Sequence, residues 1–292
     1  MEFGYYPGCS LSGTAKEFDK SLKAVLKVLD VNLLEIQNWS CCGASSAHVT
    51  NHLLSVALPV RNIIEAKKQG LNEIVAPCAA CYNRLVSAQH EMKLDEKLRT
   101  KIEDLVEEKY QGSAEVYNLI QLFQKTGLEE IKSKKKADLS DIKVACYYGC
   151  LLVRPHSLAN FDDAEDPVSM EEIVTATGAK PLDWNFKTEC CGAAHSIAHK
   201  DIVLKLSKNI LDDAIRNGAD VIVTACPMCH SNLDMRQWSI VRSDKDFKSI
   251  PVLYLSQLIG LALGLNKKEL GIDLHFISVD PVLAKVKEEA VA

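Results

Sequence analysis

The pattern of apolar and polar positions runs through the same order of elements twice. Short apolar runs bounded by polar turns are typical of buried strands. The runs that predict strands are residues 2–6, 31–36, 73–76 and 116–117, and then 142–148, 180–184, 220–224 and 252–255. Strands that alternate with helices indicate an α/β fold, so we expect two tandem, similar Rossmann-like domains with mostly parallel sheets.

Apolar residues at helical spacing fill the segments between the strands. Phe18, Leu22 and Val25, for example, would share one face of a helix. The predicted helices cover residues 18–29, 53–69, 167–177 and 202–217, with glycines as stop signals after the last three of them. Pro59 lies inside the second of these helices and is expected to kink it or to mark a break.

Cysteines also repeat in the same order in the two halves. Each half has a single cysteine after its first strand, a Cys-Cys-Gly-Ala motif after its second strand, and a Cys-x-x-Cys motif after its third. The ten residues are Cys9, Cys41, Cys42, Cys78 and Cys81, followed by Cys150, Cys190, Cys191, Cys226 and Cys229. Because the carboxyl ends of parallel strands meet at one edge of a sheet, the five thiols of each half should converge there.

The repeat predicts two domains, residues 1–136 and 137–292. The boundary falls in the charged run 132–138, which has no apolar period and is expected to be a solvated linker. The lysine runs 134–136 and 267–268 are expected to be solvated faces. An acidic insertion at 160–166 lengthens the path from the single cysteine to the cysteine pair in the second half.

Composition and charge narrow the class of protein. A chain of 292 residues with 47% hydrophobic and 25% charged residues can build a substantial core, as is typical of a globular protein. The net charge of −5 gives no general attraction to nucleic acid. No apolar run has the length of a membrane helix and the first residues lack signal-peptide features, so we expect a cytoplasmic protein without a membrane partner.

A reducing cytoplasm makes structural disulfides rare, so the ten repeated cysteines are expected to bind metal or a cluster. Cys146, the eleventh, has no counterpart in the first half and is expected to be a small buried hydrophobe. Structural zinc takes four ligands. Five thiols, two of them adjacent, favour an unusual iron–sulfur cluster in each half.

Three other uses of the cysteines stay open at this point. Zinc in one domain is the alternative cofactor, and a zinc-stabilised scaffold without catalysis is a related alternative. Ordinary thiol–disulfide exchange is disfavoured, because Cys78 and Cys81 are not expected to open a helix as in a thioredoxin-like start. Three further thiols also accompany them.

With these motifs the chain resembles the cysteine-rich CCG domain family that includes the catalytic B subunit of coenzyme B–coenzyme M heterodisulfide reductase. The resemblance rests on the doubled Cys-Cys-Gly motif and on Tyr-Tyr-Pro-Gly-Cys at residues 5–9, and it spans residues 5–258. It implies two noncubane [4Fe-4S] clusters, one in each domain, each held by the five cysteines given above. It implies no catalytic residue beyond these ligands.

The same resemblance implies a reaction and its partners. The reaction would be two-electron reduction of the CoM-S-S-CoB disulfide to its two thiols, between clusters that face one cavity. Electrons would come from a ferredoxin-like iron–sulfur C subunit and a flavin-containing A subunit, and through them from a hydrogenase or formate dehydrogenase. Other dehydrogenases use the same domains. The alternative function is therefore that of an iron–sulfur electron-transfer subunit of a glycolate, lactate, glycerol phosphate or succinate type enzyme.

Such a substrate carries sulfonate, carboxylate and phosphate groups, so its site should contain cationic side chains. His195, His230 and Arg154 are the preferred candidates for binding substrate. Further candidates near the motifs are His48, Arg84, His199, Lys200 and Arg236. The chain has no G-x-G-x-x-G after a strand, so no flavin or nicotinamide site of its own is expected.

Overall fold

The computed structural model describes residues 1–44, 47–159 and 161–288, and shows two similar parallel sheets of four strands each. Residue 160 of the acidic insertion lies outside this part. The first sheet has the order β2-β1-β3-β4, with β1 (Glu2–Tyr5), β2 (Asn32–Glu35), β3 (Glu73–Val75) and β4 (Glu115–Tyr117). The second has the order β7-β6-β8-β9, with β6 (Lys143–Tyr147), β7 (Lys180–Pro181), β8 (Val221–Thr224) and β9 (Val252–Tyr254). The identical order confirms the tandem Rossmann-like fold.

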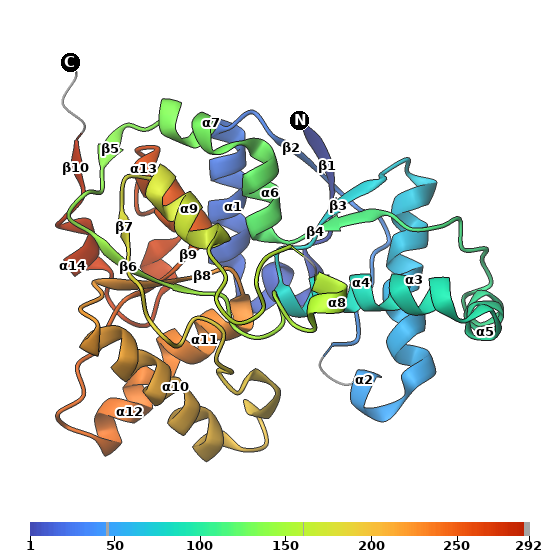
Figure 1. Ribbon diagram of the computed structural model, residues 1–292. Helices are drawn as coiled ribbons and strands as arrows, with labels where there is room; N and C mark the ends of the chain where they lie inside the picture. The colour runs from blue at the N-terminus through green and yellow to red at the C-terminus, as the bar shows by residue number, and fades with distance from the viewer. Residues whose placement is uncertain (45–46, 160, 289–292) are drawn as a thin grey trace.

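Helices cover the two sheets and extend to opposite sides of the molecule (Figure 1). The first half contains α1 (Lys16–Val28), α2 (Ala47–Thr50), α3 (His52–Lys68), α4 (Ala79–Leu94), α5 (Glu96–Val106), α6 (Leu119–Thr126) and α7 (Leu128–Ser133). The second contains α8 (His156–Ala159), α9 (Ser169–Ala176), α10 (Lys200–Arg216), α11 (Pro227–Met235), α12 (Gln237–Ser243), α13 (Leu255–Ala262) and α14 (Asp280–Leu283). Three short helical turns accompany these helices, namely η1 (Ser10–Thr14), η2 (Ala193–His195) and η3 (Ile272–Leu274).

The helices α1, α3, α9 and α10 lie close to their predicted positions, but α3 differs in one detail. Helix α3 continues through Pro59 without a break. Val56 and Val60, on either side of the proline, are buried, and α3 packs along α4. Burial therefore keeps the helix continuous despite the missing backbone donor.

The charged run between the halves is not the solvated linker that the sequence suggests. The Lys136 backbone N–H donates to the Ala262 carbonyl over 2.8 Å. The next residues form β5 (Ala137–Asp138), which pairs antiparallel with β10 (Lys287–Glu288) near the end of the chain. Lys134 forms an ion pair with Asp30. Backbone pairing thus fixes this segment against the second half, and the boundary at residue 136 between two independent domains stays a prediction.

The two halves share one continuous hydrophobic core. Helix α1 lies between the sheets, where it packs against α13 (Figure 1). The Phe18 ring stacks on the Tyr254 ring at 4.2 Å between centroids. Nearby, the buried hydroxyls of Ser21 and Ser256 are hydrogen-bonded at 2.7 Å. The relative position of the two sheets, and of the loops at their edges, is therefore set by packing across the halves.

Candidate metal centres

A tight turn at the end of the first strand places the single cysteine of each half. The residue before each cysteine is a glycine in the left-handed region, Gly8 with φ +62° and Gly149 with φ +67°. A Cβ atom on Gly8 would lie 2.9 Å from Cys81 Sγ, and one on Gly149 would lie 2.9 Å from Cys229 Sγ. Glycine is needed here both for the backbone conformation and for its close approach to sulfur.

A buried tyrosine in each half holds the loop that carries the cysteine pair. The Tyr6 hydroxyl donates to the Ser40 carbonyl over 2.6 Å, directly before Cys41. The Tyr147 hydroxyl donates to the Glu189 carbonyl over 2.6 Å, directly before Cys190. Burial, followed by the charge of the neighbouring cysteines, raises the pKa of both tyrosines above the ordinary range, so both remain neutral donors.

The Cys-x-x-Cys motif opens a helix in each half, contrary to the sequence-based expectation. Cys78 is the N-cap residue of α4 and Cys226 is the N-cap residue of α11, while Cys81 and Cys229 lie in the first turns. A helix N-terminus stabilises thiolates by its free N–H groups and dipole. The argument against thioredoxin-like exchange therefore rests on the three further thiols that lie beside each pair.

The five thiols of each half come together at the edge of the sheet, as the topology predicts. In the first half, Cys42 Sγ lies 3.4 Å from Cys81 Sγ. In the second half, the equivalent Cys191 Sγ lies 3.6 Å from Cys229 Sγ. The single cysteine of each half interacts electrostatically with the cysteine pair and with the first cysteine of the Cys-x-x-Cys motif. Each half thus gathers five thiols in one place.

Burial differs among the five thiols of each group. Three members are buried in both halves, namely Cys42, Cys78 and Cys81, and Cys191, Cys226 and Cys229. The single cysteine and the first member of the pair face outward: Cys9, Cys41 and Cys190 are exposed and Cys150 is half-buried. A bound centre would therefore be enclosed on the side of the three buried cysteines and accessible beside the two outer ones.

Interactions among the thiols favour ionisation of part of each group. A hydrogen bond from Cys81 lowers the pKa of Cys42 to about 7. A hydrogen bond from Cys150, helped by the Gly192 N–H group, lowers the pKa of Cys190 to about 6. Since metals bind thiolates and not thiols, these groups are prepared to exchange protons for a cation.

Cys146 lies apart from both groups in β6. Its side chain is fully buried, as the sequence predicts, and burial raises the pKa of its thiol well above the usual range. Its carbonyl accepts a hydrogen bond from Trp184 Nε1 over 3.0 Å. Cys146 therefore belongs to the sheet and its packing.

Each half reaches across to the single-cysteine loop of the other half. The turn η1, which follows Cys9, packs against α11, the helix that begins at Cys226 of the second half. In the reciprocal position, α4, which begins at Cys78, packs against α8 in the loop after Cys150. The loops of the two thiol groups are therefore built partly from each other's half.

Hydrogen bonds from α4 make one of these cross-contacts specific. The buried Asn83 donates from Nδ2 to the carbonyls of Arg154 at 3.2 Å and Leu151 at 3.5 Å. The Tyr82 hydroxyl donates to the Ala159 carbonyl over 3.1 Å. The residues after Cys81 thus fix the backbone after Cys150, a role that no sequence motif indicates.

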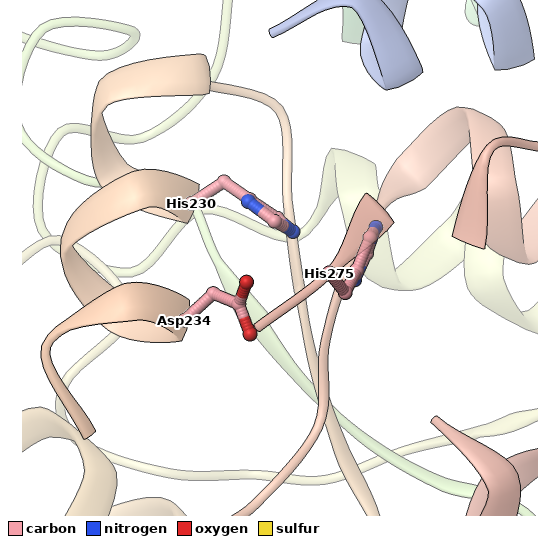
Figure 2. Close-up of side chains that lie close together, drawn as sticks. All are labelled: His230, Asp234 and His275. Atoms are coloured by element: carbon pink, nitrogen blue, oxygen red, sulfur yellow. The ribbon is translucent and has the colours of Figure 1, made fainter. Parts of the chain in front are cut away.

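His230, a predicted substrate contact, is 4% exposed and packs inside the molecule. Its Nε2 is hydrogen-bonded to the Val252 carbonyl at 3.1 Å and its ring stacks on Tyr254 at 4.1 Å. Figure 2 shows His230 and His275 directed toward each other, with Asp234 one turn further along α11. The ring therefore lies inside the molecule, where it packs α11 against β9 and His275.

The His230, Asp234 and His275 side chains offer ligand atoms within 4.8 Å of one another, but hydrogen bonding argues against a metal there. Gln257 Oε1 accepts from the Tyr254 N–H group, so Gln257 Nε2 donates to His275 Nε2 over 2.8 Å. The single proton of the neutral His275 ring is then on Nδ1, where a metal would have to bind. Burial keeps the ring neutral by lowering the pKa of His275 to about 4.

The other two preferred substrate candidates lie beside the second thiol group. Arg154 donates to Glu165 Oε2 and Thr188 Oγ1, both at 3.0 Å, and so connects the loop after Cys150 to the loop before Cys190. His195 is exposed in η2, and its charge contributes to lowering the pKa of Cys190, after the larger effect of Cys150. His195 is thus the preferred candidate best placed to meet a bound molecule.

The remaining candidates are spread over both halves. His48, His199 and Lys200 are exposed, and the His199 ring lies 5.5 Å from the His195 ring. Arg236 donates from Nη2 to the Ser196 carbonyl over 2.9 Å. Arg84 donates from Nη2 to Asn83 Oδ1 over 2.9 Å.

The donor set of each half fits an iron–sulfur cluster. Zinc is satisfied by four tetrahedral ligands and would leave one of the five thiols without a role. A multinuclear cluster offers several irons, so adjacent cysteines such as Cys41 and Cys42 can bind different ones. The surrounding N–H donors, at Gly43 and Gly192, supply the hydrogen bonds that thiolate ligands accept.

Two duplicated α/β halves with five converging thiols each define the class of protein. A family model described as "CCG: Cysteine-rich domain" matches residues 3–86 and 144–234, once in each half. The chain belongs to this family of cysteine-rich iron–sulfur proteins. Among the described residues, no helix has the length and apolar character needed to cross a membrane.

Individual relatives match over nearly the whole chain. The chain is 36% identical to the B subunit of the ferredoxin/F420H2-dependent CoB-CoM heterodisulfide reductase of Methanosarcina acetivorans, over 97% of this chain and 96% of that one. It is 37% identical to the 8-methylmenaquinol:fumarate reductase membrane anchor subunit of Wolinella succinogenes, over 94% of this chain and 97% of that one.

A solved structure of a hypothetical protein from Helicobacter pylori resembles the fold with a TM-score of 0.75. The similarity covers 95% of this chain and 52% of that one at 13% identity, and it shows the fold alone.

Proposed function

We propose that this chain is the catalytic subunit of a heterodisulfide reductase, which reduces CoM-S-S-CoB to coenzyme M and coenzyme B. In this proposal each half binds one noncubane [4Fe-4S] cluster. The ligands would be Cys9, Cys41, Cys42, Cys78 and Cys81 in the first half, and Cys150, Cys190, Cys191, Cys226 and Cys229 in the second. Similarity to the Methanosarcina acetivorans protein supports the class of enzyme.

The reciprocal packing of the halves is the observation that carries the proposal. Helix α4 supports the loop after Cys150, and α11 supports the loop after Cys9. A disulfide between two such centres could have one sulfur near each of them. This arrangement suits a substrate with two reacting sulfur atoms better than a chain of centres that only passes electrons along.

The reaction breaks one S–S bond and forms two S–H bonds, so it takes up two electrons and two protons. Bound iron–sulfur clusters would supply the electrons one at a time. The chain's own residues would hold the substrate and admit protons beside the exposed Cys9, Cys41 and Cys190. His195 and Arg154 are the candidates to bind its sulfonate, carboxylate or phosphate groups by charge-assisted hydrogen bonds. A ferredoxin-like C subunit and a flavin-containing A subunit would deliver electrons from a hydrogenase or formate dehydrogenase.

The Wolinella succinogenes relative favours a second candidate function. Its identity of 37% to a subunit of a fumarate reductase supports a role as the iron–sulfur electron-transfer subunit of another dehydrogenase or reductase. In that case the two centres would relay electrons to or from a separate catalytic subunit. No disulfide would then be cleaved on this chain.

Turnover of the heterodisulfide distinguishes the two functions. The chain, purified without oxygen and checked for iron and sulfide, is mixed with reduced viologen and CoM-S-S-CoB, and viologen oxidation is followed by absorbance. The CoM homodisulfide serves as the substrate control. We expect turnover with the heterodisulfide that Cys42→Ala and Cys191→Ala each abolish. Intact centres without turnover, alone and with partner subunits, would favour the electron-transfer function.

A further inference from the structure

The third residue after the last cysteine lies at the same position in both halves but differs in chemistry. The first half reads Cys81-Tyr82-Asn83-Arg84 and the second reads Cys229-His230-Ser231-Asn232. Both residues lie one turn into the helix that begins at the Cys-x-x-Cys motif. The first half therefore has a cation where the second has a neutral amide.

In the second half this amide contacts a cluster ligand directly. Asn232 is 2% exposed, and its Nδ2 donates to the Cys191 carbonyl at 3.2 Å and to Cys191 Sγ at 3.6 Å. Its Oδ1 lies 3.0 Å from Ser196 Oγ. Because the Cys191 carbonyl can only accept, the NH₂ group must face that carbonyl and the neighbouring sulfur.

The loop around Ser196 is fixed in turn. Arg236 donates from Nη2 to the Ser196 carbonyl over 2.9 Å, from the end of the same helix that carries Asn232. The N–H···S contact is therefore part of a supported network, and its geometry does not depend on one flexible side chain.

In the first half, Arg84 brings a positive charge near the equivalent ligand. Its guanidinium is half-buried and is held by Asn83 Oδ1 at 2.9 Å. Arg84 takes the place in α4 that Asn232 takes in α11, so its charge lies one helical turn after Cys81. Asn83 is itself fixed by carbonyls of the other half, so the cation has a defined position.

We propose that Arg84 and Asn232 tune the reduction potential of the cluster in their own half, one as a cation and the other as a buried N–H donor to sulfur. Reduction adds negative charge to a cluster and its sulfurs, so either group stabilises the reduced form and raises its potential. Because a charge and a dipole act with different strength, the two clusters are not equivalent. The inference rests on the proposal that both halves bind iron–sulfur clusters.

Redox titration of the full chain tests this tuning role. The variants Arg84→Gln and Asn232→Leu are titrated without oxygen, with both clusters followed by electron paramagnetic resonance. Cys42→Ala, which should keep only the second cluster, assigns the signals. We expect each variant to shift one potential downward and to leave the other unchanged. The expected size is a roughly tenfold change in the ratio of reduced to oxidised cluster at fixed potential, which is about 59 mV for one electron.

Two matched controls separate tuning from general effects. Lys93→Gln removes an exposed cation further along α4, and Ser231→Ala changes the exposed neighbour of Asn232; neither should move a potential. If Asn232→Leu loses its cluster, the redox titration is made on Asn232→Asp, which keeps the side-chain volume but removes the N–H donors. Unchanged potentials in variants with full iron and sulfide content would overturn the inference. A wild-type chain without iron would instead contradict the proposed function.

Discussion

At the scale of single residues, the glycines before Cys9 and Cys150 show how closely the backbone approaches the cysteine sulfurs. Gly8 combines a left-handed conformation with a space in which any Cβ atom would meet Cys81 Sγ. Gly70 has a similar φ of +76° but nothing within 4 Å of an added Cβ atom. A comparison of Gly8 with Gly70 therefore separates the effect of backbone strain from the effect of a clash with the cysteine sulfurs.

We expect Gly8→Ala to lose the first cluster while the second is retained. The backbone strain alone costs about 1–2 kcal/mol, and the contact with sulfur must in addition displace Cys81. Gly70→Ala should show the strain as a lower thermal midpoint but keep its full iron content. Iron and sulfide analysis with thermal unfolding checks this prediction, which fails if both variants bind equal iron.

Cys146 provides a second residue-scale test, because it is the one cysteine that the duplication does not explain. Cys146→Ala should keep both clusters and lose about 1 kcal/mol of unfolding free energy through a small cavity. Cys42→Ala should lose one cluster, because a missing thiolate leaves an iron without its ligand. Ultraviolet–visible absorption and iron content compare the two variants. Loss of a cluster from Cys146→Ala would show that this thiol is a ligand.

The ten converging cysteines could be predicted because residue type, order and strand position all agree in the two halves. Asn83, Asn232 and Tyr6 could not be predicted in the same way. They act through hydrogen bonds to backbone carbonyls or sulfur, and their partners are distant in sequence. The position of His230 beside Cys229 predicts a substrate contact, but proximity in sequence does not reveal that its ring is stacked on Tyr254.

At the scale of elements, periodicity predicts the strands of the two sheets and the helices α1, α3, α9 and α10, but not α4 or α11. Residues 79–83 of α4 are all buried, so no polar face marks the helical repeat. The pairing of β5 with β10 cannot be predicted either, since two-residue strands carry no periodic signal.

Helix α11 is tied to the segment after η3 by a buried carboxylate. Asp234 accepts from the backbone N–H groups of Phe276 at 2.8 Å and Ile277 at 3.0 Å. Burial, with a smaller contribution from Glu17, raises the pKa of Asp234 to about 6. The rings of His230 and His275 face it, and burial lowers the pKa of both, so they stay neutral near pH 7.

This raised pKa predicts the pH dependence of stability. The native state holds the Asp234 proton more tightly than the unfolded chain, whose pKa is about 3.9, so this group contributes less stability as pH rises. Between pH 5 and pH 7 the loss is roughly 1 kcal/mol. Denaturant unfolding of wild type and Asp234→Asn should therefore differ in pH slope, with the variant gaining on wild type toward pH 7. Parallel profiles would contradict the assigned pKa.

At the scale of the whole molecule, the shared core and the reciprocal contacts make each half depend on the other. Asn83 joins α4 to the loop after Cys150, and both the NH₂ group and the oxygen of its side-chain amide are hydrogen-bonded. We expect Asn83→Ala to lower the free energy of unfolding by about 1–3 kcal/mol, because buried carbonyls lose their donor.

The exposed Asn32, bonded to Glu2 between neighbouring strands, provides the control, and Asn32→Ala should change stability by less than about 0.5 kcal/mol. Denaturant titration followed by fluorescence and by cluster absorbance compares them. Equal effects of the two substitutions would argue against a specific bridge between the halves.

Metal content tests the central claim most directly: each half binds its own iron–sulfur centre through its five cysteines. Iron, sulfide and zinc are measured on the chain purified without oxygen, and on Cys42→Ala and Cys191→Ala. We predict about eight irons and eight sulfides in the wild-type chain, and about four of each in either variant. One zinc ion in either half, or the loss of all iron from a single variant, would contradict two separate iron–sulfur centres.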